Sequence, residues 1–212
     1  MNSEYTAPRY EQSALITIDV QRDFLDRQPF EITGTSAIVP TIGRLAQFFR
    51  SRARPIVHVV RLYRSDGSNV DPSRRHLIEQ GAELVRPGSA GSQLAEPLLP
   101  AADIALDSDV LLAGGFQVVG RKEWIMYKPR WGAFFGTKLE EHLRSLSAST
   151  LVFAGCNFPN CPRTSIYEAS ERDFRVVAVE DAISGLYERG RTELEAIGAR
   201  VVRTENLLSE AV

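Results

Sequence analysis

An acid, a base and a thiol each stand just beyond a short apolar run of this sequence: Asp19, Lys128 and Cys161. A thiol held beside a carboxylate and an ammonium group can attack a carbonyl carbon. The carboxylate takes the thiol proton and the cation holds the thiolate by charge. Backbone N–H groups in the 156–161 turn would then receive the oxyanion. These residue types therefore predict nucleophilic acyl transfer.

The segment around Cys161 is typical of a strand, a tight turn and a helix start. An apolar run at 150–154 precedes Gly155, and Pro162 suits the first position of a helix. A thiol at a helix N-terminus lies in positive potential, so we expect a lowered pKa and a reactive thiolate. A buried structural cysteine is the alternative interpretation of the same pattern.

The other two residues also have a plain alternative. Asp19 could cap the next helix, and Lys128 could be a surface lysine whose stem lies along apolar side chains. We favour function for Asp19, because ligands of open parallel sheets bind at the carboxyl ends of the strands. No histidine is placed to pair with the thiol, which disfavours a papain-like Cys–His pair.

Alternating strands and helices must position these residues. Apolar runs predict strands at 14–20, 55–60, 124–128, 150–154, 176–179 and 200–202. Helical spacing predicts helices at 36–52, 139–146, 162–172 and 188–197, with a short one at 73–80. This order favours an α/β fold with a parallel sheet covered on both faces. Parallel strands end at one edge, so the acid, base and thiol can meet there.

Length and composition indicate a single domain over residues 1–212. Residues 1–12 are polar and predict an N-terminal arm. Residues from about 61 to 122 predict an irregular excursion from the sheet that contributes to the rim of the site. A formal net charge of -2 and the lack of a long apolar run disfavour nucleic acid and membrane as partners. Two cysteines and no leader sequence lead us to expect a cytoplasmic protein.

Three segments in order resemble the isochorismatase-like cysteine hydrolase superfamily. They are Ala-Leu-Ile-Thr-Ile-Asp-Val-Gln-Arg-Asp-Phe at 14–24, Tyr-Lys-Pro-Arg-Trp-Gly-Ala-Phe-Phe at 127–135 and Gly-Cys-Asn-Phe-Pro-Asn-Cys-Pro-Arg-Thr-Ser at 155–165. The resemblance implies a three-layer α/β/α, Rossmann-like fold with a six-stranded, mostly parallel sheet. It implies Asp19, Lys128 and Cys161 as a catalytic triad, and a homo-oligomer, either a dimer or a tetramer.

The resemblance also implies details of the nucleophile turn and the reaction. The Cys156–Asn157 peptide bond would be cis, and the N–H groups of Asn157 and Cys161 would form the oxyanion hole. The presence of Cys161 favours hydrolysis of a C–N bond through a thioester. The histidines, His58, His76 and His142, lack the metal-binding spacing of related nicotinamidases, so we predict no metal and no cofactor.

The substrate class follows from the residues expected at the rim. The aromatic residues suggest a pocket for a small planar amide, lactam or ureido compound; they are Phe24, Trp131, Phe134, Phe135 and Phe158. Arg61, Arg64, Arg74 and Arg75 could recognise a carboxylate, although most of them should be solvated, and we choose Arg64 as a substrate-binding residue. Two other functions stay open: vinyl-ether hydrolysis without covalent catalysis, and a non-catalytic or redox role for Cys156 and Cys161.

Overall fold

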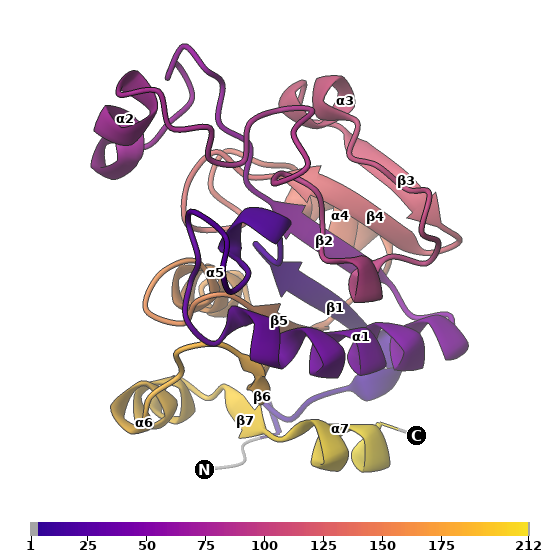
Figure 1. The fold of residues 1–212 in the computed structure, drawn as a ribbon. Coiled ribbons are helices and arrows are strands. Elements are labelled where there is room, and N and C mark those ends of the chain that lie inside the picture. The colour runs from indigo at the N-terminus through magenta and orange to yellow at the C-terminus, as the bar shows by residue number, and fades with distance from the viewer. Residues whose placement is uncertain (1–3, 212) are drawn as a thin grey trace.

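Seven strands form one twisted sheet in the computed structural model, which describes residues 4–211 (Figure 1). The strand order is β3-β4-β2-β1-β5-β6-β7, and every neighbouring pair is parallel except β3 and β4. The strands are β1 (Ser13–Ile18), β2 (Ile56–Val60), β3 (Phe116–Gly120), β4 (Glu123–Tyr127), β5 (Thr150–Gly155), β6 (Arg175–Ile183) and β7 (Arg200–Val202).

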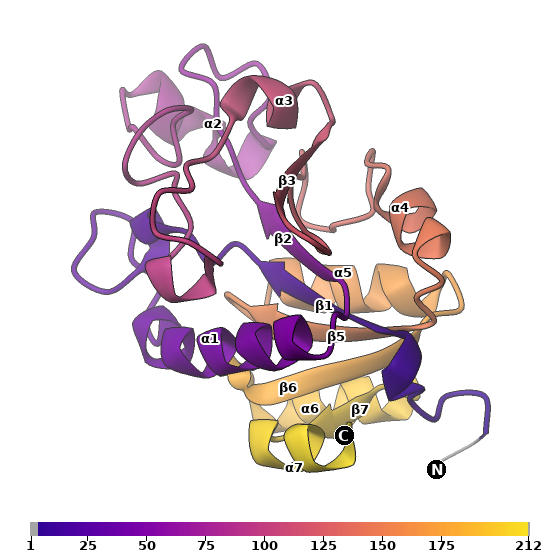
Figure 2. The ribbon, with the colours of Figure 1, turned by 90° about the vertical axis from the view of Figure 1, so that its right-hand side faces the viewer.

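Two layers of helices cover the sheet (Figure 2). The side chains of α1 and α7 share one core with one face of the sheet, and those of α4, α5 and α6 share another core with the opposite face. The helices are α1 (Thr35–Ser51), α2 (Pro72–Glu79), α3 (Ser108–Leu112), α4 (Leu139–Ser145), α5 (Cys161–Ser170), α6 (Glu188–Ala196) and α7 (Thr204–Glu210). The three-layer α/β/α fold predicted from the sequence is confirmed.

The register of the central strands aligns their carboxyl ends. Ile18 lies opposite both Val59 and Gly155, and Val60 lies opposite Tyr127. Strands β1 and β5 are buried along their whole length, which explains their continuous apolar sequences. The residues that follow β1, β2 and β4 therefore emerge at one edge of the sheet, and so does the turn after β5.

The prediction of six strands was wrong by one. The missed strand, β3, lies inside the excursion expected at about 61–122 and pairs antiparallel with β4 at the edge of the sheet. Its residues are half-buried or exposed, and Val118 is 69% exposed. An edge strand with little burial leaves no clear apolar pattern, which is why the sequence did not reveal it. The same excursion contains α2 and α3.

The expected N-terminal arm lies partly outside the described residues, which begin at residue 4. Tyr10–Gln12 form a 3-10 helix directly before β1. The N–H of Arg9 donates a hydrogen bond to Thr150 Oγ1 at 2.8 Å, which ties this segment to the start of β5. Within residues 4–211, the helices are all too short or too polar to cross a membrane.

Candidate active site

Asp19 and Lys128 form a buried ion pair at the carboxyl edge of the sheet. The Lys128 Nζ lies 2.8 Å from Asp19 Oδ2, and neither side chain is more than 6% exposed. Asp19 follows β1 with a left-handed backbone (φ 52°), a conformation that Asp tolerates better than most residues. Lys128 follows β4, where its N–H donates to Val60 O. The ends of two strands thus bring the carboxylate of Asp19 and the ammonium group of Lys128 together.

Cys161 opens helix α5 and lies beside this pair. Its side chain is buried, with 5% of the residue exposed. Close approach of β5 to β1 brings the turn here, because a Cβ on Gly155 (φ 129°) would lie 2.2 Å from Ile18 O. The Ser165 hydroxyl donates to Cys161 O at 2.7 Å, and the N–H of Ala133 donates to the same hydroxyl at 3.0 Å. These bonds tie the start of α5 to the segment after Lys128.

Our expectation of a lowered Cys161 pKa is corrected by this geometry. Burial raises the pKa of the Cys161 thiol above its ordinary value, and the negative charge of Asp19 raises it further. The positive charges of Lys128 and Arg61 act in the opposite direction without overcoming these two effects. The thiol is therefore protonated at rest, and it needs a base to become a nucleophile.

Asp19 retains an acceptor for that proton. Its Oδ2 lies 2.8 Å from Lys128 Nζ in the ion pair, whereas its Oδ1 is buried and has no hydrogen-bond partner among the described residues. An unpaired buried carboxylate oxygen is costly to keep, so a site that keeps one has unused capacity to bind a proton.

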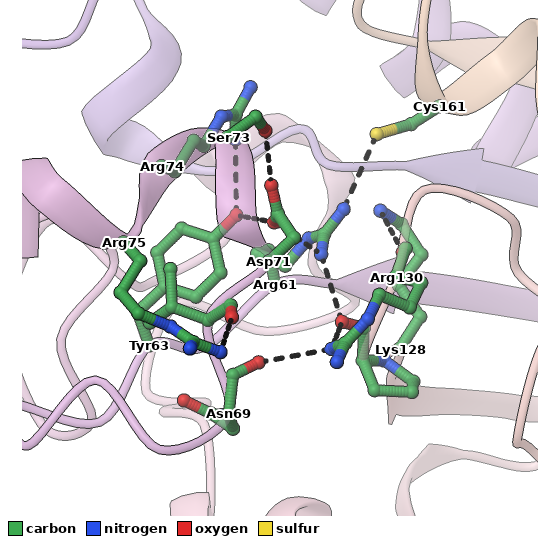
Figure 3. A network of polar contacts seen from close by, with 12 residues as sticks. Arg61, Tyr63, Asn69, Asp71, Ser73, Arg74, Arg75, Lys128, Arg130 and Cys161 are labelled. Carbon is green, nitrogen blue, oxygen red and sulfur yellow. Dashed lines mark hydrogen bonds and ion pairs between the residues drawn. The ribbon is translucent and has the colours of Figure 1, made fainter.

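Arg61 is the additional residue that the structure brings to the thiol (Figure 3). It follows β2 and is only 1% exposed. Its Nη2 lies 3.7 Å from Cys161 Sγ, and its Nη1 donates to Pro129 O at 3.2 Å and to Asp71 Oδ2 at 3.3 Å. Arg61 therefore places a second positive charge, in addition to that of Lys128, next to the sulfur.

Asp71 holds Arg61 in place together with residues of the excursion. Its Oδ2 also accepts from the Tyr63 hydroxyl at 2.7 Å, and its Oδ1 accepts from the Ser73 hydroxyl at 2.6 Å. Burial alone would raise the pKa of Asp71, but these hydrogen bonds and the charges of Arg61 and Arg74 lower it to about 2. Asp71 is therefore ionised at neutral pH.

The backbone of the nucleophile turn has the geometry expected from the resemblance. The Cys156–Asn157 peptide bond is cis. Within the described chain, the N–H groups of Asn157 and Cys161 donate no hydrogen bond to another residue. The Cys156 thiol is buried and donates to Asp19 O at 3.1 Å, so it supports the backbone that carries the acid.

The aromatic residues expected at the rim lie in different environments. Phe24 packs among buried side chains of the excursion, with Tyr63 and Cys156. Phe134 belongs to the core under α5, and the Phe158 ring packs edge-on against Tyr187 at 5.4 Å. These three are buried.

The other two aromatic residues and Arg64 lie at the surface. Phe135 is 58% exposed and Trp131 is 36% exposed. Arg64 is exposed, and its N–H donates to Asn69 Oδ1. The structure does not bring Arg64 into the hydrogen-bonded network around the thiol; it brings Arg61 instead. The signal was present in the sequence, because Arg61 directly follows a buried strand, as Asp19 and Lys128 do.

Residues 4–211 contain no group of three or more His, Cys, Asp or Glu side chains arranged to hold a metal ion. His58 instead lies inside β2 and bridges Thr17 Oγ1 and Glu123 Oε1, each at 2.8 Å. That the protein uses no metal ion and no cofactor remains a prediction.

An α/β/α fold with an acid, a lysine and a cysteine at one sheet edge defines a class of hydrolase-like proteins, and comparison with known proteins identifies the family. The family model described as "Isochorismatase domain" matches residues 13–206, so the chain belongs to the isochorismatase family. It is similar to a probable inactive nicotinamidase of Arabidopsis thaliana, with 30% identity covering 83% of this chain and 82% of the relative.

Two further relatives extend the comparison. A ureidoacrylate amidohydrolase of Cronobacter sakazakii is 26% identical, covering 81% of this chain and 74% of its own. The crystal structure of an isochorismatase family protein from Desulfovibrio vulgaris superimposes with a TM-score of 0.80 at 31% identity, covering 94% of this chain and 97% of the other. The family suggested by the three sequence motifs is thereby confirmed.

Proposed function

We propose that this protein is a cysteine-dependent hydrolase that cleaves a C–N bond of a small amide, lactam or ureido compound through an acyl-enzyme thioester. The observation that carries the proposal is the cluster at the sheet edge: the Asp19–Lys128 pair at 2.8 Å, an unpaired Asp19 Oδ1, and a buried Cys161. The similarity to amidohydrolases supports the choice of a C–N bond.

The first half of the reaction forms the thioester. Asp19 takes the proton of the Cys161 thiol as the sulfur attacks the carbonyl carbon of the substrate and a C–S bond forms. The tetrahedral intermediate collapses, its C–N bond breaks, and Asp19 returns the proton to the leaving nitrogen. Lys128 and Arg61 stabilise the negative charge on sulfur during the transfer, which partly offsets the effects of burial and of Asp19 on the thiol pKa.

The second half restores the enzyme. A water molecule attacks the thioester carbon while Asp19 accepts one of its protons. The C–S bond breaks, the acid is released, and the proton returns to the Cys161 sulfur. In both halves the N–H groups of Asn157 and Cys161 would bind the oxyanion, and their lack of other partners among the described residues supports this role.

Two other functions are retained as alternatives. Vinyl-ether hydrolysis would use Asp19 without a covalent intermediate. A non-catalytic role is kept because the name of the Arabidopsis relative includes the word "inactive". The two cysteines are both free and buried in the structure, which gives no support to a redox pair.

The decisive experiment is a panel of small amides, lactams and ureido compounds assayed by ammonia or amine release, with mass spectrometry of the acid-quenched enzyme. We expect an acyl group on the peptide that contains Cys161. Cys161→Ala should abolish both turnover and adduct, whereas Cys156→Ala should keep an adduct on Cys161. An isochorismate-like vinyl ether assayed beside the panel tests the alternative, because its hydrolysis should survive in Cys161→Ala. Amide turnover that survives in Cys161→Ala, or a wild-type protein with neither turnover nor adduct, would contradict the proposal.

We also propose that the protein forms a homo-oligomer, either a dimer or a tetramer. The exposed edge strand β3, with Val118 69% exposed, is compatible with a covered surface in an assembly. Light scattering after size-exclusion chromatography measures the mass directly, and a mass near 23.6 kDa would contradict this proposal.

A further inference from the structure

The turn that carries Cys161 is held by the segment between β6 and α6. Phe158 lies in this turn, directly after Asn157 and ahead of Cys161, so it separates the two N–H groups of the proposed oxyanion hole. Its own N–H donates to Ser184 O at 2.8 Å, and the N–H of Ser184 donates to Gly155 O at 3.1 Å. The backbone of the turn is therefore fixed to the residue that follows β6.

The ring of Phe158 is enclosed between α5 and α6. The side chain is fully buried. Its ring packs edge-on against Tyr187 at 5.4 Å between the ring centroids, and the guanidinium carbon of Arg163 lies 5.8 Å from the Phe158 centroid. Arg163, in α5, donates to the Tyr187 hydroxyl at 2.9 Å and to Glu193 Oε2, in α6, at 2.6 Å. These two bonds join the helices beside the ring.

Gly190, in the first turn of α6, lies directly against the same ring. A Cβ at position 190 would lie 2.3 Å from Phe158 Cε1 and 2.9 Å from Phe158 Cζ. Carbon atoms that are not bonded to each other do not approach so closely, because their optimal separation is about 3.5–4.0 Å. Glycine inside a helix is less favourable than alanine, so this close approach is a physical reason for glycine at the position.

A side chain at position 190 would displace the turn. The Phe158 ring belongs to the close-packed core that α5 and α6 share, so it has no open space to move into. The displacement passes to the backbone of Phe158, which is bonded to Asn157. A shift of about 1 Å in a group that acts on the reacting atoms can cost roughly 100-fold in rate.

We infer that Gly190 is a positioning residue: by letting α6 contact the Phe158 ring, it fixes the N–H groups of Asn157 and Cys161 where the oxyanion forms. This inference rests on the proposed function and adds to it a residue that does not touch the substrate. Loss of the fit should weaken the binding of the oxyanion and leave the reactivity of the sulfur unchanged.

Two thiol reagents separate these effects. With p-nitrophenyl acetate, the Cys161 sulfur attacks the carbonyl carbon, an oxyanion and a C–S bond form, the ester C–O bond breaks and p-nitrophenolate leaves. With iodoacetamide, the same sulfur attacks the methylene carbon, a C–S bond forms and iodide leaves, without an oxyanion. In both reactions the thiol proton passes to the solvent.

The measured quantity is the ratio of the second-order rate constants for acylation and alkylation at neutral pH, with Cys161 identified as the modified residue by peptide mapping. The ratio cancels a change in the folded fraction or in the thiol pKa, because both reactions use the same folded thiolate. A merely structural role of Gly190 would therefore leave the ratio unchanged.

We expect Gly190→Ala to lower this ratio by about tenfold or more. Adding Phe158→Leu should restore most of the loss, because leucine lacks the Cε1 and Cζ atoms that the added Cβ meets. Gly43→Ala is the matched control: Gly43 lies inside α1, where its Cβ would lie 3.1 Å from Pro97 O. This change also tightens a helix contact, but away from the nucleophile turn, so the ratio should stay at the wild-type value.

An unchanged ratio in Gly190→Ala, or a loss that Phe158→Leu does not reverse, would overturn the inference and leave the proposed function standing. Where burial keeps both reagents from Cys161, turnover of a compound from the amide panel replaces the ratio. The kcat should then fall in Gly190→Ala with KM nearly unchanged and recover in the double variant, and an unchanged kcat would overturn the inference. A wild-type protein that is neither acylated nor active on the panel would contradict the proposed function, and this inference with it.

Discussion

Strands β1, β2 and β4 carry two buried polar clusters, and the two differ in how completely their hydrogen bonds are satisfied. The first cluster joins Thr17, His58 and Glu123, and Arg50 donates to both oxygens of Glu123. The second joins Asp19, Arg61 and Lys128, at the carboxyl ends of the same strands, with Cys161 at the start of α5.

In the first cluster each member has its partners, and no Thr17, His58 or Glu123 side-chain atom is buried without a hydrogen bond. In the second cluster, Asp19 Oδ1 and Arg61 Nε are both buried and unpartnered among the described residues. A satisfied buried network fixes the packing of strands, whereas an unsatisfied one has capacity left for a proton or a ligand. The comparison predicts that the first cluster serves stability and the second serves chemistry.

The largest expected effect is on turnover, from changes to the second cluster. Asp19→Asn and Lys128→Met should each lower kcat by roughly 100- to 10,000-fold, because each removes a group that acts on the Cys161 proton or charge. The double variant should lose much less than the product of the single losses, since the residues act as one unit. The matched control is Lys122→Met, which replaces an exposed lysine just before β4 and should keep normal turnover.

The same two variants should shift the pKa of the Cys161 thiol in opposite directions. Loss of the Asp19 charge lowers the thiol pKa, and loss of the Lys128 charge raises it. The pH dependence of iodoacetamide alkylation measures both shifts. Two shifts of the same sign would show that the variants act through folding rather than through local charge.

The next effect is on stability, from the first cluster. Glu123→Gln removes the buried charge that pairs with Arg50 and should lower the free energy of unfolding by about 3 kcal/mol, while the folded enzyme keeps its kcat. Glu205→Gln, in an exposed pair with Arg44, should cost about 1 kcal/mol or less. Urea unfolding followed by circular dichroism gives both values. A Glu123→Gln enzyme that stays stable but loses turnover would reverse the roles of the two clusters.

A smaller effect on the free energy of unfolding should appear at acidic pH. The pKa of Asp71 is about 2 in the folded protein, below its ordinary value of 3.8, so its ionised form stabilises the fold. This contribution of about 2 kcal/mol is fully present above roughly pH 4 and is lost as the pH falls toward 2. The stability difference between wild type and Asp71→Asn should therefore narrow over that range in urea titrations. A difference that is constant with pH would contradict the role of Asp71 as the anchor of Arg61.

The smallest expected effect is that of chelation. Among residues 4–211, no three or more His, Cys, Asp or Glu side chains are arranged to hold a metal ion. His58 is hydrogen-bonded within the first cluster. Turnover should survive dialysis against EDTA. Activity that disappears on dialysis and returns with zinc or iron would show that the site needs a metal.

The sequence by itself determined the sheet-edge residues. Continuous apolar runs are typical of strands buried on both faces, so we expected the polar residue after each run at the carboxyl edge. This local rule, together with the order of the three motifs, located Asp19, Lys128 and Cys161 and the helices on either side. It also applied to Arg61, which we named with Arg64, Arg74 and Arg75 as a possible carboxylate contact but did not choose as a substrate-binding residue.

Tertiary structure decided what depends on contacts distant in the sequence. Strand β3 is an edge strand whose pairing with β4 leaves little apolar pattern to read. The raised pKa of Cys161 comes from burial and from Asp19, which no local rule about helix termini includes. The meeting of Arg61 and Arg130 at Pro129 O joins the segments after β2 and β4, and only the parallel pairing of these two strands brings the two charges together.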